Sequence, residues 1–276
     1  MEDNKMMVSI IVMLVSIFIT KITLPYMRHM FLKANVVAKN YKGDRIPIGM
    51  GITFIPVMLM NFLLILLFFK ELSEVIFIFL AGITTMGFAG IIDDLIGNRT
   101  ASGFKGHFSR FLKGELTTGM LKAGIGGMIA LLISLLYSSG VIEFIVNAFI
   151  IALFTNFMNL LDLRPGRALK AYLLMSGIFI LIGITDTIGL ILFSIIGYCI
   201  GYLPQDLRAK SMMGDVGSNT LGITLGIITA VSFSMEIKFV WLIILLLIHM
   251  ISEKYSLSKI IKNNYLLNYL DEFGRD

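Results

Sequence analysis

Long apolar runs recur along the whole chain and constrain its fold more than any other feature. Several are close to the roughly 17–25 residues that an α-helix needs to cross a bilayer. Hydrophobic residues make up 57% of the 276 residues and charged residues only 15%, whereas a soluble domain is about a quarter charged. Closed barrels also cross membranes, but they need alternating apolar and polar residues, which these runs lack. The sequence therefore predicts an all-α polytopic membrane protein.

We expect about nine transmembrane helices, within a single domain that covers residues 1–276. Tiny connections alternate with longer loops that carry nearly all lysines and arginines. Because these residues concentrate on the cytoplasmic side of membranes, the pattern predicts an outside N-terminus and a cytoplasmic C-terminus. The predicted spans are approximately 7–25, 51–69, 75–92, 119–137, 141–158, 170–185, 187–204, 219–233 and 238–251.

Charge and cysteine content exclude several other classes. The net charge is +5, but the basic residues are spread over the loops, which indicates membrane topology and not nucleic-acid binding. The lone Cys199 excludes a disulfide or a thiolate metal site within one chain. Residues 103–116 and the cytoplasmic tail, 252–276, mix aromatic or leucine residues with basic ones. This pattern favours helices in the headgroup region over helices packed on neighbouring loops.

Two adjacent carboxylates, Asp93 and Asp94, follow directly after the apolar run 75–92. Carboxylates at the end of a span are solvated, paired or functional. One interpretation is a solvated helix end, partly neutralised by Arg99. The other is a magnesium site, because Mg²⁺ takes one or two carboxylates and leaves positions for substrate phosphates.

A polar face interrupts the next apolar helix. Asn156, Asn159 and Asp162 are three residues apart, so they share one broad face of a helix. Asn side chains also hydrogen-bond between transmembrane helices, but three polar groups ending at the cytoplasmic side favour a binding site. Arg164 and Arg167 follow at once, and arginine is a good partner for phosphate.

A glycine-rich turn precedes a late helix in "SMMGDVGSNTLG". Gly214 and Gly217 allow backbone shapes that other residues avoid, and Ser218 can cap the following helix. The first N–H groups of a helix bind anions, while Asp215 offers a carboxylate. A tight loop with an ordinary cap is an equally good interpretation of this segment alone.

A fourth element, "DRIPIGMG", places Gly49 and Gly51 at the entry to the second span. By itself it indicates only a constrained turn. All four elements fall on the cytoplasmic side of the predicted topology, however. Together, the carboxylates, glycine turns and basic residues predict a Mg²⁺-dependent phosphate site at one membrane face.

The four elements also resemble the motifs of a known family, over about residues 45–222. "PIGMG" resembles a Pro-x-x-Gly-Gly element, "GIIDDL" an Asp-Asp motif, "NFMNLLD" an Asn-x-x-Asn-Leu-x-Asp motif, and "MGDVGSNTLG" a Gly-Asp-x-Gly-Ser motif. Their order is that of the polyprenyl-phosphate N-acetylhexosamine-1-phosphate transferases (glycosyltransferase family 4). These include phospho-N-acetylmuramoyl-pentapeptide transferases and undecaprenyl-phosphate GlcNAc-1-phosphate transferases.

The resemblance implies transfer of a sugar phosphate from a UDP-linked amino sugar to a polyprenyl phosphate lipid, with release of UMP. It implies a bacterial-type plasma membrane, cell-wall precursor synthesis and Mg²⁺ as cofactor, and it is compatible with a homodimer. Asp93 and Asp94 would lie at the reaction centre, and Asp215 would bind the metal. The substrate-binding residues would be Asn156, Asn159, Asp162, Lys122, Gly49, Gly51, Arg164, Arg167, Gly217 and Ser218.

The chain departs from the family pattern in three places. The family continues its third motif as Asp-Gly-x-Asp-Gly, whereas here "DLRPGR" has Pro165 at the second aspartate position. The late histidine cluster and a closing span are missing as well. These departures keep a non-catalytic relative, binding lipid or a partner protein, as an alternative. A secondary transporter is a weaker one, because such proteins contain internal repeats with a midplane site.

Overall fold

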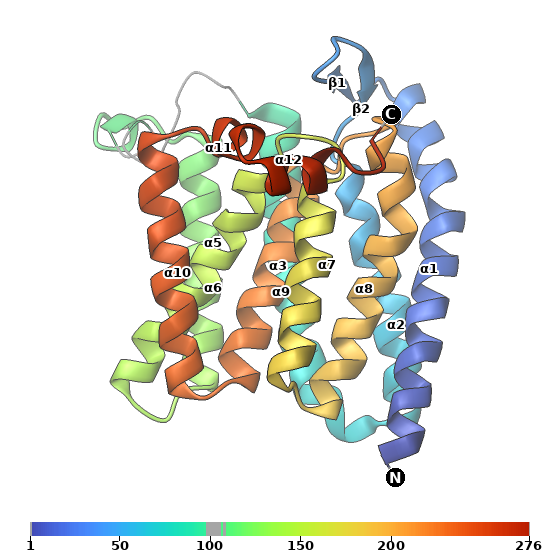
Figure 1. The fold of residues 1–276 in the computed structure, drawn as a ribbon, viewed down its shortest axis with the longest axis vertical. Coiled ribbons are helices and arrows are strands. Elements are labelled where there is room, and N and C mark those ends of the chain that lie inside the picture. Colours follow the sequence, from blue (N-terminus) through green and yellow to red (C-terminus); the bar gives the residue numbers. More distant parts are fainter. Residues whose placement is uncertain (1, 98–105, 107–108, 276) are drawn as a thin grey trace.

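The computed structural model describes residues 2–97, 106 and 109–275, and within these ranges it is a bundle of helices (Figure 1). The all-α prediction is confirmed. The nine long helices of the described residues are α1 (Glu2–Lys33), α2 (Phe54–Phe68), α3 (Ser73–Ile96), α5 (Thr118–Leu136), α6 (Val141–Leu161), α7 (Arg167–Ile182), α8 (Asp186–Leu207), α9 (Gly214–Ser232) and α10 (Met235–Lys254).

Each of the nine predicted spans coincides with one of these helices. Seven segments in the described part of the chain are long and apolar enough to cross a membrane, which leaves out α7 and α9. Helix α7 has only 16 residues. Helix α9 is rich in glycine, threonine and serine, and every residue from Val216 to Ala230 is buried. Because neighbouring helices and not lipid surround α9, it does not need a wholly apolar surface.

The connections alternate between the two ends of the bundle, so the N-terminus and the C-terminus lie at opposite ends (Figure 1). The longer connections all lie at the end that holds the C-terminus, which we call the loop end. A hairpin there has two antiparallel strands, β1 (Val37–Lys39) and β2 (Arg45–Pro47). The short helices are η1 (Met50–Thr53), η2 (Lys70–Leu72), α11 (Leu257–Asn263) and α12 (Tyr265–Glu272).

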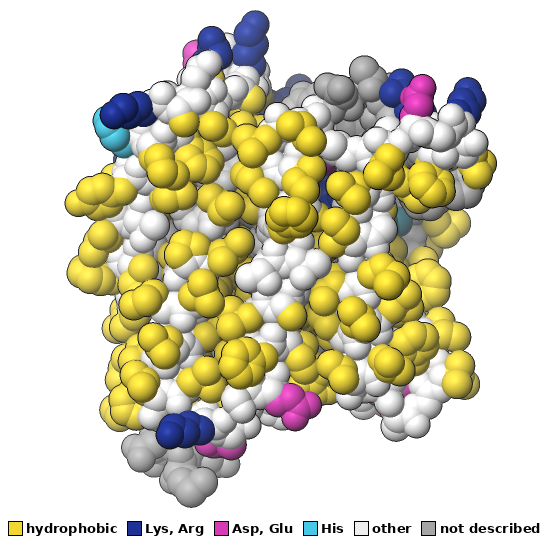
Figure 2. Space-filling view, turned by 180° about the vertical axis from the view of Figure 1, so that it is seen from behind, with side chains coloured by type: hydrophobic (Ala, Val, Ile, Leu, Met, Phe, Trp, Pro, Cys, Tyr) yellow, Lys and Arg dark blue, Asp and Glu magenta, His cyan; other side chains and the backbone are white. Residues whose placement is uncertain are grey.

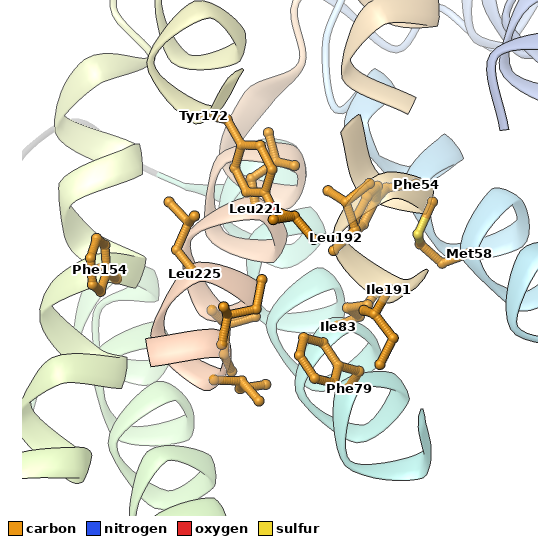
Figure 3. Close-up of a cluster of buried hydrophobic side chains, with 14 of the residues drawn as sticks. Phe54, Met58, Phe79, Ile83, Phe154, Tyr172, Ile191, Leu192, Leu221 and Leu225 are labelled. Atoms are coloured by element: carbon orange, nitrogen blue, oxygen red, sulfur yellow. The ribbon is translucent and has the colours of Figure 1, made fainter. Parts of the chain in front are cut away.

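The core is built around α9, which contacts α3 and α6. Figure 3 shows Leu221 and Leu225 of α9 among buried side chains of the surrounding helices. Glycines let the backbones approach closely, as in other membrane proteins. A Cβ atom on Gly222 would lie 2.5 Å from the Cα of Thr155 in α6, and one on Gly226 would lie 2.5 Å from the Cα of Ile151. This packing fixes the height of α9 relative to α6.

The outer surface suits a bilayer. Figure 2 shows hydrophobic side chains over the middle of one face, with most charged side chains at its upper and lower edges. Leu63, Phe77 and Leu135, from three different helices, are among the exposed apolar residues. Residues 103–105 and 107–108 of the predicted amphipathic segment 103–116 lie outside the described residues, and so does Arg99. Within that segment Leu112 is 71% exposed.

The tail forms α11 and α12 and lies across the loop end (Figure 1). Its apolar side chains are mostly exposed, including Tyr265, Leu266 and Phe273, whereas Asp271 is buried. The tail therefore turns its aromatic and apolar side chains away from the bundle and its carboxylate towards the bundle. This is the opposite of an amphipathic helix that packs its apolar face on the protein.

Candidate active site

Asp94 joins the end of α3 to the beginning of α9. Its Oδ1 accepts a hydrogen bond from the backbone N–H of Asp215 (2.9 Å), and its Oδ2 accepts one from the N–H of Val216 (3.1 Å). The first N–H groups of a helix have no partner within the helix and carry a partial positive charge. Asp94 therefore caps α9, and both of its oxygens are held in fixed directions.

Lys122 of α5 lies between the other two carboxylates. Its ammonium donates to Asp93 Oδ2 at 3.0 Å and also to Asp215 Oδ2. The three side chains keep between 15% and 28% of their surface exposed, so they are open to a ligand. Three helices, α3, α5 and α9, thus bring Asp93, Lys122 and Asp215 together. We call these residues, with Asp94, the carboxylate centre.

Glycine is required where the chain passes Asp94. Gly214 has φ +75°, a region that other residues rarely adopt, and a Cβ there would lie 2.5 Å from Asp94 Oδ2. Gly49 also has a positive φ, and its Cβ would lie 3.5 Å from the same oxygen. Two of the motifs read from the sequence therefore line one wall of the carboxylate centre.

The same two motifs bind each other through the backbone. The N–H of Met50 donates to the carbonyl of Met212 (3.1 Å), and the N–H of Gly51 donates to that of Met213 (2.8 Å). A side chain on Gly51 would overlap the backbone of Gly217. Gly51 and Gly217 are therefore needed because the two backbones pass too close together for a side chain. This close contact also sets the position of the turn that carries Asp215.

The polar face of α6 contacts the beginning of α9 through Asn159. Ser218 Oγ donates to Asn159 Oδ1 at 3.1 Å. Asp162 follows the last residue of α6, and burial first, then the charges of Asp206, Asp215 and Asp94, raise its pKa well above the ordinary value. It therefore lies within electrostatic reach of the centre. Asn156, by contrast, is exposed on the surface of α6.

The two arginines after this motif lie in other contacts. Arg164 is placed over the ring of Tyr41, with 5.2 Å between the guanidinium carbon and the ring centroid. Arg167 is only 6% exposed and pairs with Asp271 of the tail through two hydrogen bonds of 2.8 and 2.9 Å. The guanidinium of Arg167 is thus engaged by a protein carboxylate and is not presented to a phosphate. Sequence reasoning assigned it to substrate because it could not see this partner.

Asp206 of α8 is a residue that sequence reasoning missed. It is 4% exposed and accepts a hydrogen bond from the N–H of Gly166 at 2.7 Å. That N–H belongs to the residue directly before α7, so the carboxylate fixes the turn between α6 and α7. The available signal was an acidic residue at the end of "DTIGLILFSIIGYCIGYLPQDL", a helix whose only other charged residue is its first. That end is the one predicted to hold the site.

A metal ion at this site would have to be held by the carboxylates of the centre. Among the described residues, no three His, Cys, Asp or Glu side chains form a group that could hold a metal by themselves. Asp93 and Asp215 nevertheless converge on one cation, the ammonium of Lys122. Mg²⁺ is commonly bound by one or two carboxylates together with substrate phosphates. Two carboxylates in this position would suit a magnesium ion that also binds substrate phosphates.

An apolar groove of about 500 Å³ runs along α5 next to the centre. Its wall includes Met120, Leu121 and Ile125, which flank Lys122 in the sequence, and it continues to Leu132. Thr85 of α3 forms part of the other side. Met128 and Leu132 in its lining are exposed, so the groove lies on the outer surface of α5. Its apolar lining suits a hydrocarbon chain.

Comparison with known families agrees with this arrangement. The model of the family described as glycosyl transferase family 4 matches residues 76–234, which is more than half of the chain and includes Asp93, Asp94, Lys122 and Asp215. A search among curated proteins found no match. The chain belongs to glycosyl transferase family 4, the family of polyprenyl-phosphate sugar-1-phosphate transferases.

Proposed function

We propose that this membrane transferase uses a UDP-linked N-acetylhexosamine as donor and releases UMP, in the synthesis of a cell-envelope glycan precursor. The donor would be of the UDP-GlcNAc or UDP-MurNAc-pentapeptide type. The observation that carries the proposal is the convergence of Asp93 and Asp215 on Lys122 at the loop end. This is a place where a water-soluble diphosphate can meet a lipid held in an apolar groove.

The reaction joins two phosphates. An oxygen of the lipid phosphate attacks the phosphorus that bears the sugar, and the bond from this phosphorus to the bridging oxygen breaks. UMP leaves with the bonding electron pair, and the product is a sugar linked to the lipid through a pyrophosphate. A phosphate monoester is mostly doubly ionised at neutral pH, since its second pKa is about 6. The nucleophile therefore needs positioning more than it needs a base.

The residues of the centre have separate tasks in this reaction. Asp94 holds the beginning of α9 in place, because both of its oxygens already accept backbone hydrogen bonds. Lys122 supplies a positive charge to the entering phosphates. Asp93 and Asp215 would hold Mg²⁺, which when bound neutralises charge on the diphosphate and on the departing UMP.

The two substrates have separate surfaces. The groove along α5 would take the first isoprene units of the acceptor, which places the lipid phosphate near Lys122. Asn159 and Ser218, with Asp162 beside them, would line the donor side. Their amide, hydroxyl and carboxyl groups suit the hydrogen-bonding groups of a nucleotide sugar better than they suit a lipid. The exposed amide of Asn156 extends the same face of α6.

The test is a UMP-release assay on the purified protein with polyprenyl phosphate, Mg²⁺ and, in turn, UDP-GlcNAc, UDP-MurNAc-pentapeptide and UDP-GalNAc. We expect release with one donor, only when lipid and Mg²⁺ are both present. Lys122→Gln should abolish it, whereas Glu253→Gln, an exposed site on α10, should not. Release that persists without lipid would contradict the proposal. Binding of a donor without release would favour the non-catalytic relative that "DLRPGR" suggests.

A further inference from the structure

The tail makes several charged hydrogen bonds with the segment that follows Asp162. Asp271 of α12 is 8% exposed, and its carboxylate binds Arg167 through both oxygens, at 2.8 and 2.9 Å. Arg275 donates to both oxygens of the same carboxylate, at 3.0 and 3.3 Å. One tail carboxylate therefore holds two guanidinium groups. We call Arg167, Asp271 and Arg275 the tail clamp.

Further hydrogen bonds to backbone carbonyl groups join the tail to the turn at Pro165 and to α7. Arg275 donates through two nitrogens to the carbonyl oxygen of Pro165, at 3.2 and 3.0 Å. Lys170, one turn into α7, donates to the carbonyl oxygens of Leu270, Asp271 and Phe273 at 2.7, 2.5 and 3.2 Å. These bonds satisfy carbonyl groups at the end of α12, which lack partners within the helix.

The turn between α6 and α7 is thereby held from two directions. Asp206 of α8 binds the N–H of Gly166 from one side, while the tail binds the carbonyl of Pro165 and the side chain of Arg167 from the other. The turn begins at Asp162, whose N–H donates to the carbonyl of Asn159 (3.3 Å), and Asn159 in turn accepts a hydrogen bond from Ser218 near the beginning of α9. A change in the tail can therefore be transmitted to the donor side of the carboxylate centre over a few residues.

Simple anchoring of the tail would not require so many charges. Burying charged groups carries a large desolvation cost unless each is paired and hydrogen-bonded, and an apolar contact of similar size is often as stable. Paired guanidinium and carboxylate groups do, however, fix relative orientation, because the two planar groups must align. The tail clamp is thus suited to setting the geometry of the turn.

We propose that the C-terminal tail positions the donor side of the active site, with Asp271 as the positioning residue that acts through Arg167 and Arg275 on the turn at 162–166. This inference rests on the proposed function for the identity of the donor. It gives the "DLRPGR" departure a role, since Pro165 and Arg167 are the two residues of that segment that the tail binds. The tail does not touch the reacting atoms.

The first experiment measures the turn itself, without any substrate. Amide hydrogen exchange of the full-length protein would be compared for the wild type, Asp271→Asn, Arg275→Gln and the control Glu272→Gln. Glu272 is the exposed neighbour of Asp271, so its substitution changes the tail charge equally without breaking the clamp. We expect amides at 163–170 to exchange about tenfold faster in the first two variants. The control and helix α9 should be unchanged.

The second experiment measures the two substrates separately. Donor binding is followed at equilibrium without lipid, and steady-state kinetics then give a KM for each substrate. Asp271→Asn should weaken donor binding and raise the donor KM about fivefold or more, while the KM for polyprenyl phosphate and kcat stay within about twofold. Asp271→Glu, which keeps the charge, should recover part of the donor affinity. Arg275→Gln, which leaves the buried Arg167–Asp271 pair intact, gives the answer if Asp271→Asn does not fold.

Unchanged exchange at 163–170 in both clamp variants would overturn the inference. So would an equal rise of both KM values, which would indicate general destabilisation. Failure of the proposed function is a different result. A wild-type protein that binds no UDP-sugar would remove the donor assignment, while the exchange data would still decide whether the tail holds the turn.

Discussion

Two groups of charged residues lie at the loop end, and they are built in opposite ways. The carboxylate centre sets three carboxylates, those of Asp93, Asp94 and Asp215, against the single ammonium of Lys122. The tail clamp sets two guanidinium groups against one carboxylate and adds backbone carbonyls as acceptors. One group has an excess of negative charge, and the other is satisfied by the protein itself.

Exposure separates the two groups as well. The paired side chains of the centre are between 15% and 28% exposed, whereas those of the clamp are between 7% and 12% exposed. An open cluster with surplus negative charge attracts cations and leaves room for a ligand. A closed cluster whose charges are all paired instead fixes the position of the segments that it joins. Substitutions in the centre should therefore affect activity without much effect on stability, and substitutions in the clamp should affect geometry.

The largest expected effect is that of Asp215→Asn on activity. Losing this carboxylate removes one of two ligands for Mg²⁺ and one partner of Lys122, so UMP release should fall by about 10²–10³-fold or more. The melting temperature should stay the same or rise, because the substitution removes one of three neighbouring negative charges. Assays of UMP release and thermal unfolding measure the two quantities.

The matched control is Glu115→Gln, an exposed carboxylate outside the centre with a long 3.9 Å contact to Arg110. It should leave both activity and melting temperature unchanged. Equal losses of activity in Asp215→Asn and Glu115→Gln would show that general surface charge matters and that the centre does not. A fall in melting temperature with Asp215→Asn would mean that the centre is a structural group like the clamp.

Gly51→Ala is expected to have the next largest effect, this time on stability. The new Cβ would overlap the backbone of Gly217, and forcing a methyl group into a packed contact costs about 1–3 kcal/mol. The turn that carries Asp215 would have to move, so activity should fall too. Gly127→Ala on α5 is the control, because no atom lies within 4 Å of its Cβ position. Thermal unfolding and UMP release compare the two, and equal melting temperatures would contradict the packing argument.

The helices could be predicted because the lengths of apolar runs encode them directly. All nine predicted spans coincide with helices, and the tiny connections fall where they were expected. The hairpin of β1 and β2 could not be seen, since strands of three residues are too short for a periodic pattern. The enclosed position of α9 was hidden too, because its residues read as a moderately apolar span.

Ser218→Ala should have a smaller effect, limited to the donor. It removes the hydrogen bond to Asn159 Oδ1, which is worth about 0.5–1.5 kcal/mol. The donor KM should therefore rise about twofold to tenfold, with the KM for polyprenyl phosphate unchanged. Thr229→Ser, which keeps a hydrogen bond to the carbonyl of Leu225 farther along α9, is the control. A rise in the lipid KM alone would move Ser218 to the acceptor side.

The smallest expected effect is on the pH dependence of stability that the clamp contributes, and it is measurable only in acid. Burial raises the pKa of Asp271, but hydrogen bonds from Arg167 and then Arg275 outweigh it and lower the pKa to about 2. The unfolded value is about 3.9, so this carboxylate contributes stability that is fully present above about pH 4 and is lost as the pH falls towards 2. The melting temperature of the wild type should therefore fall more steeply between about pH 4 and pH 2 than that of Asp271→Asn. Parallel curves would contradict this role.

The site was only partly readable from the sequence. The carboxylates and the glycines were named because each motif has its own chemical pattern, whereas Lys122 was named only through the family resemblance. The structure brings most of these residues together. The partner of Arg167 was not readable, since it lies 104 residues away. Asp271 and Glu272 are neighbours, and only the orientation of α12 shows which carboxylate faces inward.

The polar character of α9 has a consequence for how the protein is made. By length and hydropathy this helix is not among the described segments that could enter a bilayer alone. The two helices that it contacts most extensively, α3 and α6, come earlier in the chain. During synthesis, both are therefore available to receive α9 when it leaves the ribosome. The order of translation thus provides helices that can shield the polar groups of α9 from lipid. A circular permutation that placed α9 first should insert poorly.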